Sequence, residues 1–325
     1  FILKELADNV IPDIGVLRVY VPATVNSRTL QLFNGMSANE KYSCLKNWKL
    51  LNFDKEFTTG TWITTFINNR SDRVQRSRAF AQLIVEDISA DKHFIVGSNI
   101  QGFLKFISQE WHKHLKILPL STLTLDFLNS YAHKLRVCMT TEDLNVRLKA
   151  MGVISYDGDP YDIVKLGRFL KKESYPCADA VLSFHKVNIE SINDYNKILD
   201  IINKPGKQKQ IEEILTKWFM SKFILVENKD LTGDALSLWI SNHTPPFYLN
   251  KIMGMQNIKG PGLELIHEWE NWEKCYKAGL LLFNPLPQKV RQGFHNFLDI
   301  PEFGFLEKEY LETLVNNKEI LKKYR

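Results

Sequence analysis

The sequence lacks the features that mark several large classes of protein. It has no apolar run of the roughly 18 residues that a membrane-spanning helix requires, and its longest apolar stretches, such as 279–283, are core-sized. Its four cysteines are widely spaced without a CxxC pair, which argues against a disulfide framework and favours a reducing, cytoplasmic compartment. The N-terminal segment has no signal-peptide pattern and no initiator Met, so we expect the chain to be a piece of a longer polypeptide.

Motifs of well-known enzyme classes are also missing. The sequence contains no GxGxxG, GxxxxGK[ST], GxSxG or HExxH pattern and no kinase signature. An ExxH spacing at Glu264 and His267 has no second copy, whereas a di-iron bundle requires two. Motifs therefore leave open whether the protein is an enzyme.

The composition is that of an ordinary globular protein. The 325 residues include 42 Lys and Arg against 37 Asp and Glu, a net charge of +5, and 44% of them are hydrophobic. This length predicts about two domains. The polar segment 203–210, which carries Pro205 and Gly206, is the best linker, so we predict an N-terminal domain at 1–203 and a C-terminal domain at 204–325.

Helical periodicity dominates the pattern of apolar residues. Apolar spacing, capping residues and prolines predict helices near 71–88, 98–118, 122–136, 140–151, 159–172, 191–203, 207–222, 233–242, 263–281, 287–298 and 306–322. Strand-like runs are few and short, at 16–21, 94–96, 153–156 and 223–226. The sequence therefore predicts a mainly α fold of antiparallel hairpins, as a bundle or irregular solenoid, with at most a small sheet.

The densest positive charge lies at the start of the predicted helix 71–88. Arg70, Arg73, Arg76 and Arg78 occur within nine residues, and the first three would share one face opposite the apolar stripe. Cations oppose the macrodipole at a helix N-terminus, so phosphate groups of a nucleic acid are candidate partners. Lys113, Lys207 and Lys209 are further candidate contacts. The alternative is a solvated or internally paired surface.

Carboxylates cluster at Asp157, Asp159 and Asp162. The D-x-D at Asp157 and Asp159 resembles, in this narrow respect, the metal site of DxD glycosyltransferases, where a divalent cation neutralises a diphosphate. We therefore consider Mg²⁺ or Mn²⁺ as an alternative cofactor. Helix initiation alone also accounts for these residues, with Asp159 as the N-cap and Pro160 at N1.

A glycine-rich loop precedes the predicted helix 263–281. Lys259, Gly260 and Gly262 place a cation and free backbone amides near a helix N-terminus, where a phosphate can bind. The simpler interpretation is a loop punctuated by Gly and Pro.

Three hypotheses follow from these patterns. The first is a non-catalytic helical module of an intracellular assembly, which binds nucleic acid or a protein through the arginine cluster and the aromatic stripe of Trp269, Trp272 and Tyr276. Under this first hypothesis the protein needs no cofactor. The alternative is a metal-dependent transferase acting on a nucleotide sugar or another diphosphate, and the third is a structural scaffold.

Overall fold

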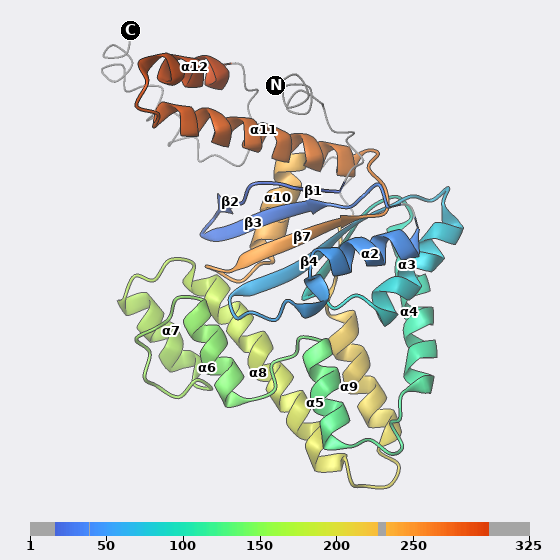
Figure 1. Cartoon of the computed structure of the whole chain (residues 1–325). Helices are drawn as coiled ribbons and strands as arrows, with labels where there is room; N and C mark the ends of the chain where they lie inside the picture. Colours follow the sequence, from blue (N-terminus) through green and yellow to red (C-terminus); the bar gives the residue numbers. More distant parts are fainter. Residues whose placement is uncertain (1–16, 39, 227–231, 299–325) are drawn as a thin grey trace.

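A mixed β-sheet runs through the middle of the molecule (Figure 1). The computed structural model describes residues 17–38, 40–226 and 232–298. Its seven strands are ordered β1-β3-β7-β4-β5-β6, with β2 paired to β3. They are β1 (Arg18–Val19), β2 (Ala23–Val25), β3 (Arg28–Asn34), β4 (Thr61–Asn69), β5 (Lys92–Gly97), β6 (Phe223–Leu225) and β7 (Leu249–Met255).

The five strands from β3 to β6 across the sheet are parallel, whereas β1 and β2 run antiparallel to β3. The last strand in sequence, β7, is inserted between β3 and β4. Lys251 of β7 is paired with Gln31 on one side and with Ile63 on the other. Two segments that lie more than 200 residues apart in the sequence, β3 and β7, are thereby paired in one sheet.

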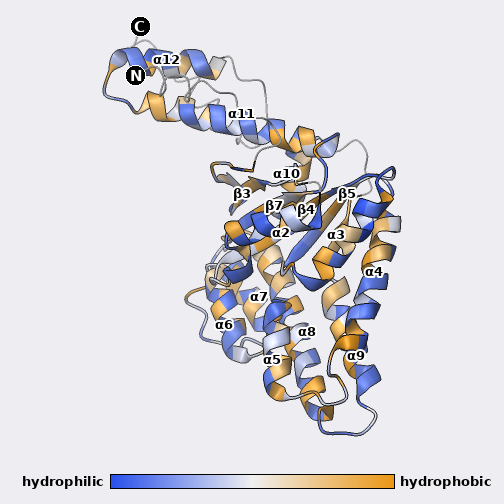
Figure 2. Cartoon of the chain, turned by 45° about the vertical axis from the view of Figure 1, so that its right-hand side comes forward, coloured by the Kyte–Doolittle hydropathy of each residue, from blue (hydrophilic) through white to orange (hydrophobic). Residues whose placement is uncertain are grey.

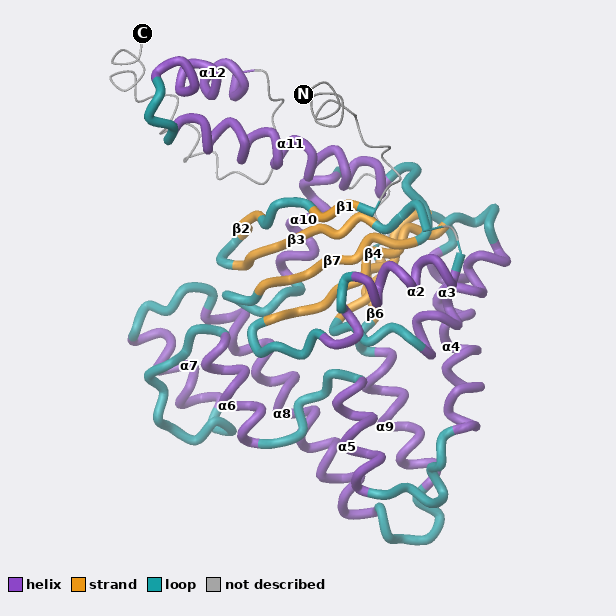
Figure 3. Tube along the Cα trace, viewed as in Figure 1, coloured by secondary structure: helices purple, strands orange, loops and turns teal. Residues whose placement is uncertain are grey.

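Helices cover both faces of this sheet (Figures 1 and 3). On one face lie α2 (Lys41–Leu50), α3 (Val74–Glu86) and α4 (Ile100–Ile117), and on the other lie α10 (Gly233–Asn242) and α11 (Pro261–Leu282). The helix α12 (Pro287–Leu298) packs back on α11. The short 3-10 turn η1 (Phe53–Lys55) follows α2.

Alternation along the strands divides the apolar residues between the two faces. In β4, Ile63 and Ile67 pack with α2, α3 and α4, whereas Phe66 packs with α10 and α11. In β7, Met253 and Ile252 divide in the same way. Parallel strands buried on both faces require this two-sided apolar pattern.

A block of helices is inserted between β5 and β6 and lies beyond the amino ends of the parallel strands (Figure 1). It comprises α5 (Leu125–Lys134), α6 (Thr141–Ala150), α7 (Ile163–Lys172), α8 (Ala178–Ile201) and α9 (Gln208–Met220). Trp111 of α4 stacks on Phe219 of α9 with ring centroids 4.1 Å apart. Figure 2 shows both hydrophobic and hydrophilic residues along these helices, as expected of amphipathic helices.

The predicted fold class was wrong. The protein is an α/β fold with a seven-stranded, mostly parallel sheet, and not a helical bundle or solenoid with a minor sheet. Three of its central strands, β3, β4 and β7, were missed because Gln31, Thr64, Thr65, Lys251 and Gly254 interrupt the apolar runs by which strands were identified. The expected strand at 153–156 has no regular secondary structure, with only a bend at Ser155.

Local helix signals were more reliable than the fold class. The predictions 233–242 and 287–298 agree with α10 and α12 at both ends, and Thr140 caps α6 through a capping box with Asp143. The predicted helix 191–203 is the second half of the longer α8. The predicted helix 306–322 lies outside the described residues.

Residues 203–207 of the predicted linker lie in the connection between α8 and α9, whereas 208–210 begin α9. Strands from both sides of it belong to the same sheet. The proposed domain boundary itself stays a prediction. Within the described ranges, no helix is both long enough and apolar enough to cross a bilayer.

Buried charges join the helical block to the amino ends of the strands. Asp91 and Arg136 form an ion pair of 3.2 Å in which each side chain is 6% exposed, and Asp91 also accepts from the backbone N–H of Ile63. Lys222 is buried beside them and donates to the carbonyl of Ala90 at 2.6 Å. Burial lowers the pKa of Lys222 to about 7, although Asp91 partly opposes the shift.

This depressed pKa predicts a pH-dependent stability. Between about pH 7 and 10.5 the unfolded chain holds the Lys222 proton more tightly than the folded chain, so stability should rise with pH in that window. Relative to Lys222→Met, the wild type should gain up to about 1.4 kcal/mol per pH unit. Urea unfolding of both proteins at pH 6.5, 7.5 and 8.5 measures this difference, with Lys171→Met on the surface of α7 as the control. A difference that does not change with pH would contradict the prediction.

Candidate functional site

The carboxyl ends of β3, β7, β4 and β5 meet at one edge of the sheet. The helices that follow β3, β4 and β5 lie on one face, whereas α11, which follows β7, lies on the other. The chain therefore leaves the sheet in opposite directions around β7. In open α/β sheets ligands bind in the crevice at such a switch point.

Buried polar side chains fill this edge. Asn68, at the end of β4, donates from Nδ2 to the carbonyl oxygens of Asn257 and Lys259 at 2.8 and 2.7 Å. Asn257 returns a hydrogen bond from its own Nδ2 to the Asn68 carbonyl at 2.8 Å. The loop after β7 is thereby fixed against the end of β4.

The neighbouring asparagine connects β4 to β5 and α3. Asn69 donates to the carbonyl of Ser98 at 2.7 Å and accepts from the Ser77 hydroxyl at 2.7 Å. Gln256 donates to the same Asn69 oxygen at 3.4 Å, but its own Oε1 is buried without a hydrogen-bond partner in the described structure. This oxygen is an acceptor for a donor such as an ammonium group, because buried polar groups are normally paired.

Gly262 allows the loop and α11 to approach this network. A Cβ at Gly262 would lie 2.8 Å from the Asn257 carbonyl oxygen and 2.9 Å from Asn68 Nδ2. No other residue leaves room for both contacts. The glycine is thus required by close packing, and it holds the N-terminus of α11 at the edge of the sheet.

Arginine side chains bring positive charge next to these hydrogen-bonded asparagines. Arg70 forms a two-pronged pair with Asp72, at 2.9 and 2.7 Å, and Arg73 lies 3.6 Å from the same carboxylate. Arg76 donates to Asn257 Oδ1 at 2.6 Å. Burial lowers the pKa of Arg76, and the nearby charges of Arg73 and Arg70 lower it further. One carboxylate therefore faces three guanidinium groups.

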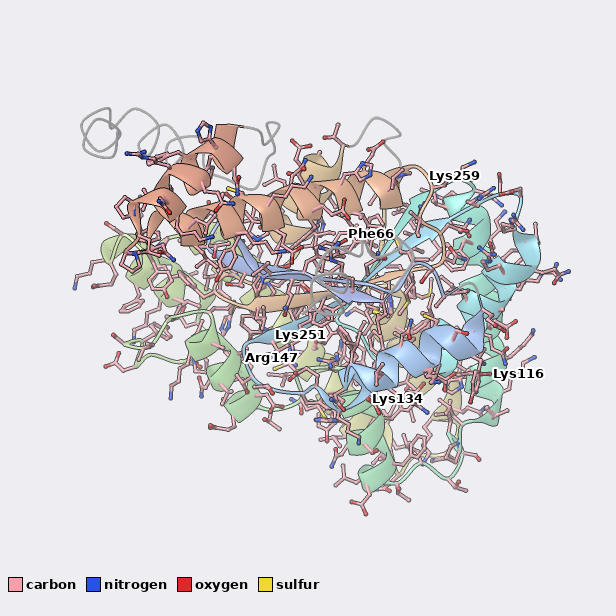
Figure 4. All side chains as sticks on the ribbon, turned by 45° about the horizontal axis from the view of Figure 1, so that its top comes forward. Phe66, Lys116, Lys134, Arg147, Lys251 and Lys259 are labelled. Carbon is pink, nitrogen blue, oxygen red and sulfur yellow. The ribbon has the colours of Figure 1, made fainter. Side chains whose placement is uncertain are left out.

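We call this group the carboxyl-edge site. It consists of Asn68, Asn69, Arg70, Arg73, Arg76, Asn257 and Lys259. Two features predicted separately from the sequence, the arginines and the Lys259–Gly260–Gly262 loop, meet here through Arg76 and Asn257. Figure 4 shows Lys259 well away from Arg147 and Lys251, towards the other end of β7.

The arginines do not share a helix face as expected. Helix α3 begins at Val74, so Arg70 and Arg73 precede it, and Arg73 occupies the N-cap position. Arg78 points elsewhere and lies over the ring of Phe106 on α4 at 5.1 Å.

The other predicted cations do not join the carboxyl-edge site. Lys113 pairs with Glu110 on α4, and Lys207 donates to the carbonyl of Ile202. Lys209 lies on α9. These three belong to the far ends of α4 and the helical block, and the structure leaves their predicted role in binding as a prediction.

Asp157 and Asp159 lie at the other end of the sheet. Their loop joins α6 to α7, and Gly152 at its start lies against Tyr175 and Phe247, just before β7. Lys259 follows the opposite end of β7, so about 20 Å of strand separates the two regions. The predicted metal ligands and diphosphate loop are therefore not brought together.

Hydrogen bonds give Asp159 and Asp162 structural roles. Asp159 accepts from the backbone N–H of Tyr161, and Asp162, rather than Asp159, caps α7. In the described ranges no three His, Cys, Asp or Glu residues gather in a way that could hold a metal ion. A role of Asp157 and Asp159 in metal binding stays a prediction.

Sequence reasoning missed the asparagines of the site. The signal was the pair Asn68 and Asn69 directly after the apolar residues Phe66 and Ile67. Because β4 was not recognised as a strand, its end could not be recognised as the edge of a sheet.

The role of Gly262 yields a prediction. Gly262→Ala should destabilise the fold by about 1–3 kcal/mol through overpacking against Asn257 and Asn68. Gly167→Ala, in the middle of α7 with only ordinary contacts to Leu182, should be neutral or stabilising by up to about 1 kcal/mol. Urea denaturation of both variants tests the difference, and equal behaviour would refute the packing argument.

Comparison with known families gives one match. Residues 19–165, a little under half of the chain, match the family described as Poly-gamma-glutamate synthase CapB C-terminal domain. The matched part runs from β1 to the start of α7 and includes Asn68, Asn69 and the four arginines. No curated protein and no solved structure matches the chain.

This match corrects the leading hypothesis from the sequence. A similarity to part of a synthase, in an α/β fold, contradicts a non-catalytic helical module that binds nucleic acid. The alternative hypothesis of a transferase agrees better with it.

Proposed function

We propose that this chain provides the substrate-binding domain of an enzyme related to poly-γ-glutamate synthase, and that the carboxyl-edge site binds the glutamate polymer. The observation that carries the proposal is the excess of guanidinium groups at the switch point of the sheet. Arg70 and Arg73 contact a single carboxylate, Asp72, and Arg76 lies close enough to interact with the same charges. The matched family supplies the substrate class.

The chemistry of the polymer suits this charge. In a γ-linked chain each glutamate spends its side-chain carboxyl on the peptide bond and retains a free α-carboxylate. Successive units therefore present a row of carboxylates, and guanidinium forks bind carboxylates through paired hydrogen bonds. The exposed Lys259 adds a further cation beside the row.

Chain extension also needs an amine. The reaction joins the nitrogen of one glutamate to the side-chain carboxyl carbon of another, while a C–O bond of that carboxyl breaks and the oxygen leaves with its activating group. The incoming ammonium must therefore lose one proton before it attacks and a second one afterwards. The buried Gln256 Oε1, unpaired in the described structure, is an acceptor one residue before Asn257, which accepts from Arg76. It is our candidate for orienting that amine.

Charge reversal tests the proposal. A fluorescent γ-linked glutamate oligomer should bind the wild type with an anisotropy change that weakens as salt rises, because salt screens exposed charges. Arg73→Glu with Lys259→Glu should lower the affinity at least about ten-fold, as expected for loss of two charge-assisted contacts. Lys171→Glu, an exposed lysine on α7, should leave it unchanged.

A neutral γ-linked glutamine oligomer is the matched ligand control. Equal binding of the two oligomers, or equal loss in the Lys171→Glu protein, would refute a role of the carboxyl-edge site. A requirement for Mg²⁺ or Mn²⁺ stays a prediction, which the same titration with and without a chelator tests. We also propose a cytoplasmic location, on the free thiols of the four cysteines, and a protein partner within a larger assembly.

A further inference from the structure

A cavity of about 170 Å³ lies at the amino ends of the parallel strands, between the sheet and the helical block. It is lined by the start of β4, by Tyr248 before β7, and by residues of α5, α6 and the segment between them. A smaller cavity of about 70 Å³ adjoins it and shares Trp62, Arg147 and Tyr248. The larger space has room for about ten water molecules, or for a small organic ligand.

The carboxylates of this cavity are already satisfied. Asp91 is paired with Arg136 and accepts from the N–H of Ile63. Asp143 accepts from the N–H groups of Met139 and Thr140 at the start of α6. Neither carboxylate therefore needs a cation from a ligand.

Two cations of these cavities, Arg147 and Lys92, form no ion pair in the described structure. Arg147 donates only to neutral oxygens in the described structure, the side chain of Asn188 at 3.0 Å and the carbonyl of Arg136 at 3.1 Å. Lys92, in the smaller cavity, donates to the carbonyl of Ser221 at 2.8 Å. Burial lowers the pKa of Lys92, although the charge of Asp91 partly opposes the shift.

A further donor on this wall has no acceptor. The indole Nε1 of Trp62 is buried without a hydrogen-bond partner in the described ranges. The Trp62 ring packs edge-on against Phe184 and Tyr248, with centroids 5.8 and 6.1 Å away. An aromatic wall thus carries an unused N–H beside an arginine without a counter-ion.

We propose that these joined cavities bind a small organic oxyanion, a carboxylate or a phosphate, with its charge at Arg147 and Trp62 Nε1 and its apolar body against the aromatic wall. In the described structure Arg147 and Lys92 donate to neutral oxygens and Trp62 Nε1 has no acceptor, and an anion would supply both an acceptor and a compensating charge. We call the joined cavities the amino-edge cavity. It is a different site from the carboxyl-edge site, because the length of the strands separates them.

Benzoate, phenyl phosphate and the neutral benzamide are suitable probes, because they share a flat ring and differ in charge. Thermal unfolding and isothermal titration should show saturable binding of one or both anions to the wild type, with a melting temperature that rises with ligand concentration. Benzamide should give no saturable shift. The anion that binds more tightly, benzoate or phenyl phosphate, shows whether the ligand is a carboxylate or a phosphate.

Two variants locate the binding. Trp62→Phe keeps the aromatic wall but removes the N–H, and it should weaken anion binding about ten-fold, as expected for a hydrogen bond to a charged group. Arg147→Gln should weaken it further. Because Arg147 also joins α6 to α8 and could be needed for folding, Trp62→Phe is the decisive variant.

Two control variants change residues outside the amino-edge cavity. Trp239→Phe, on the exposed surface of α10, and Arg73→Glu, in the carboxyl-edge site, should both retain wild-type binding of the anions. The proposal is overturned if the wild type shows no saturable binding of either anion, or if Trp62→Phe binds as tightly as the wild type.

Discussion

The position of β7 between β3 and β4 is the constraint on which the rest of the structure depends. Six or seven residue pairs on each side fix its register, and a slip of one residue would exchange Ile252 with Met253 between the two cores. The same register sets the loop after β7 against the end of β4. The carboxyl-edge site therefore exists only when a strand from late in the sequence closes the sheet.

The register of β7 places the loop after it against the end of β4. Hydrogen bonds from side-chain amides then hold the residues of the carboxyl-edge site in place. Asn68 and Asn257 exchange bonds with each other's backbone, which compensates for the burial of loop groups that would otherwise lose their water. Arg76 is then oriented by Asn257 rather than by a carboxylate. The positive charge at this edge is left for a ligand to neutralise.

At the opposite edge of the sheet the contacts are made by charged side chains instead of side-chain amides. There the helical block is attached by Asp91, Arg136 and Lys222 around the starts of the strands, and cavities remain where helices and strand ends do not fill the space. An irregular junction of this kind explains why a donor such as Trp62 Nε1 is buried without a backbone acceptor in the described structure. Cations thus lie in two environments: partly exposed at the carboxyl edge and beside cavities at the amino edge.

The sequence by itself determined the helices whose signals are local, such as α10 and the Thr140 cap of α6, and it identified the arginines and the Lys259 loop as separate candidates. Tertiary structure decided the rest. Strands β3, β4 and β7 carry polar residues that become buried only through pairing between segments up to 220 residues apart, as Thr29 and Leu249 are. The meeting of Arg76 with Asn257, and the separation of both from Asp157 and Asp159, follow from that pairing because strand order is set by long-range contacts and not by local periodicity.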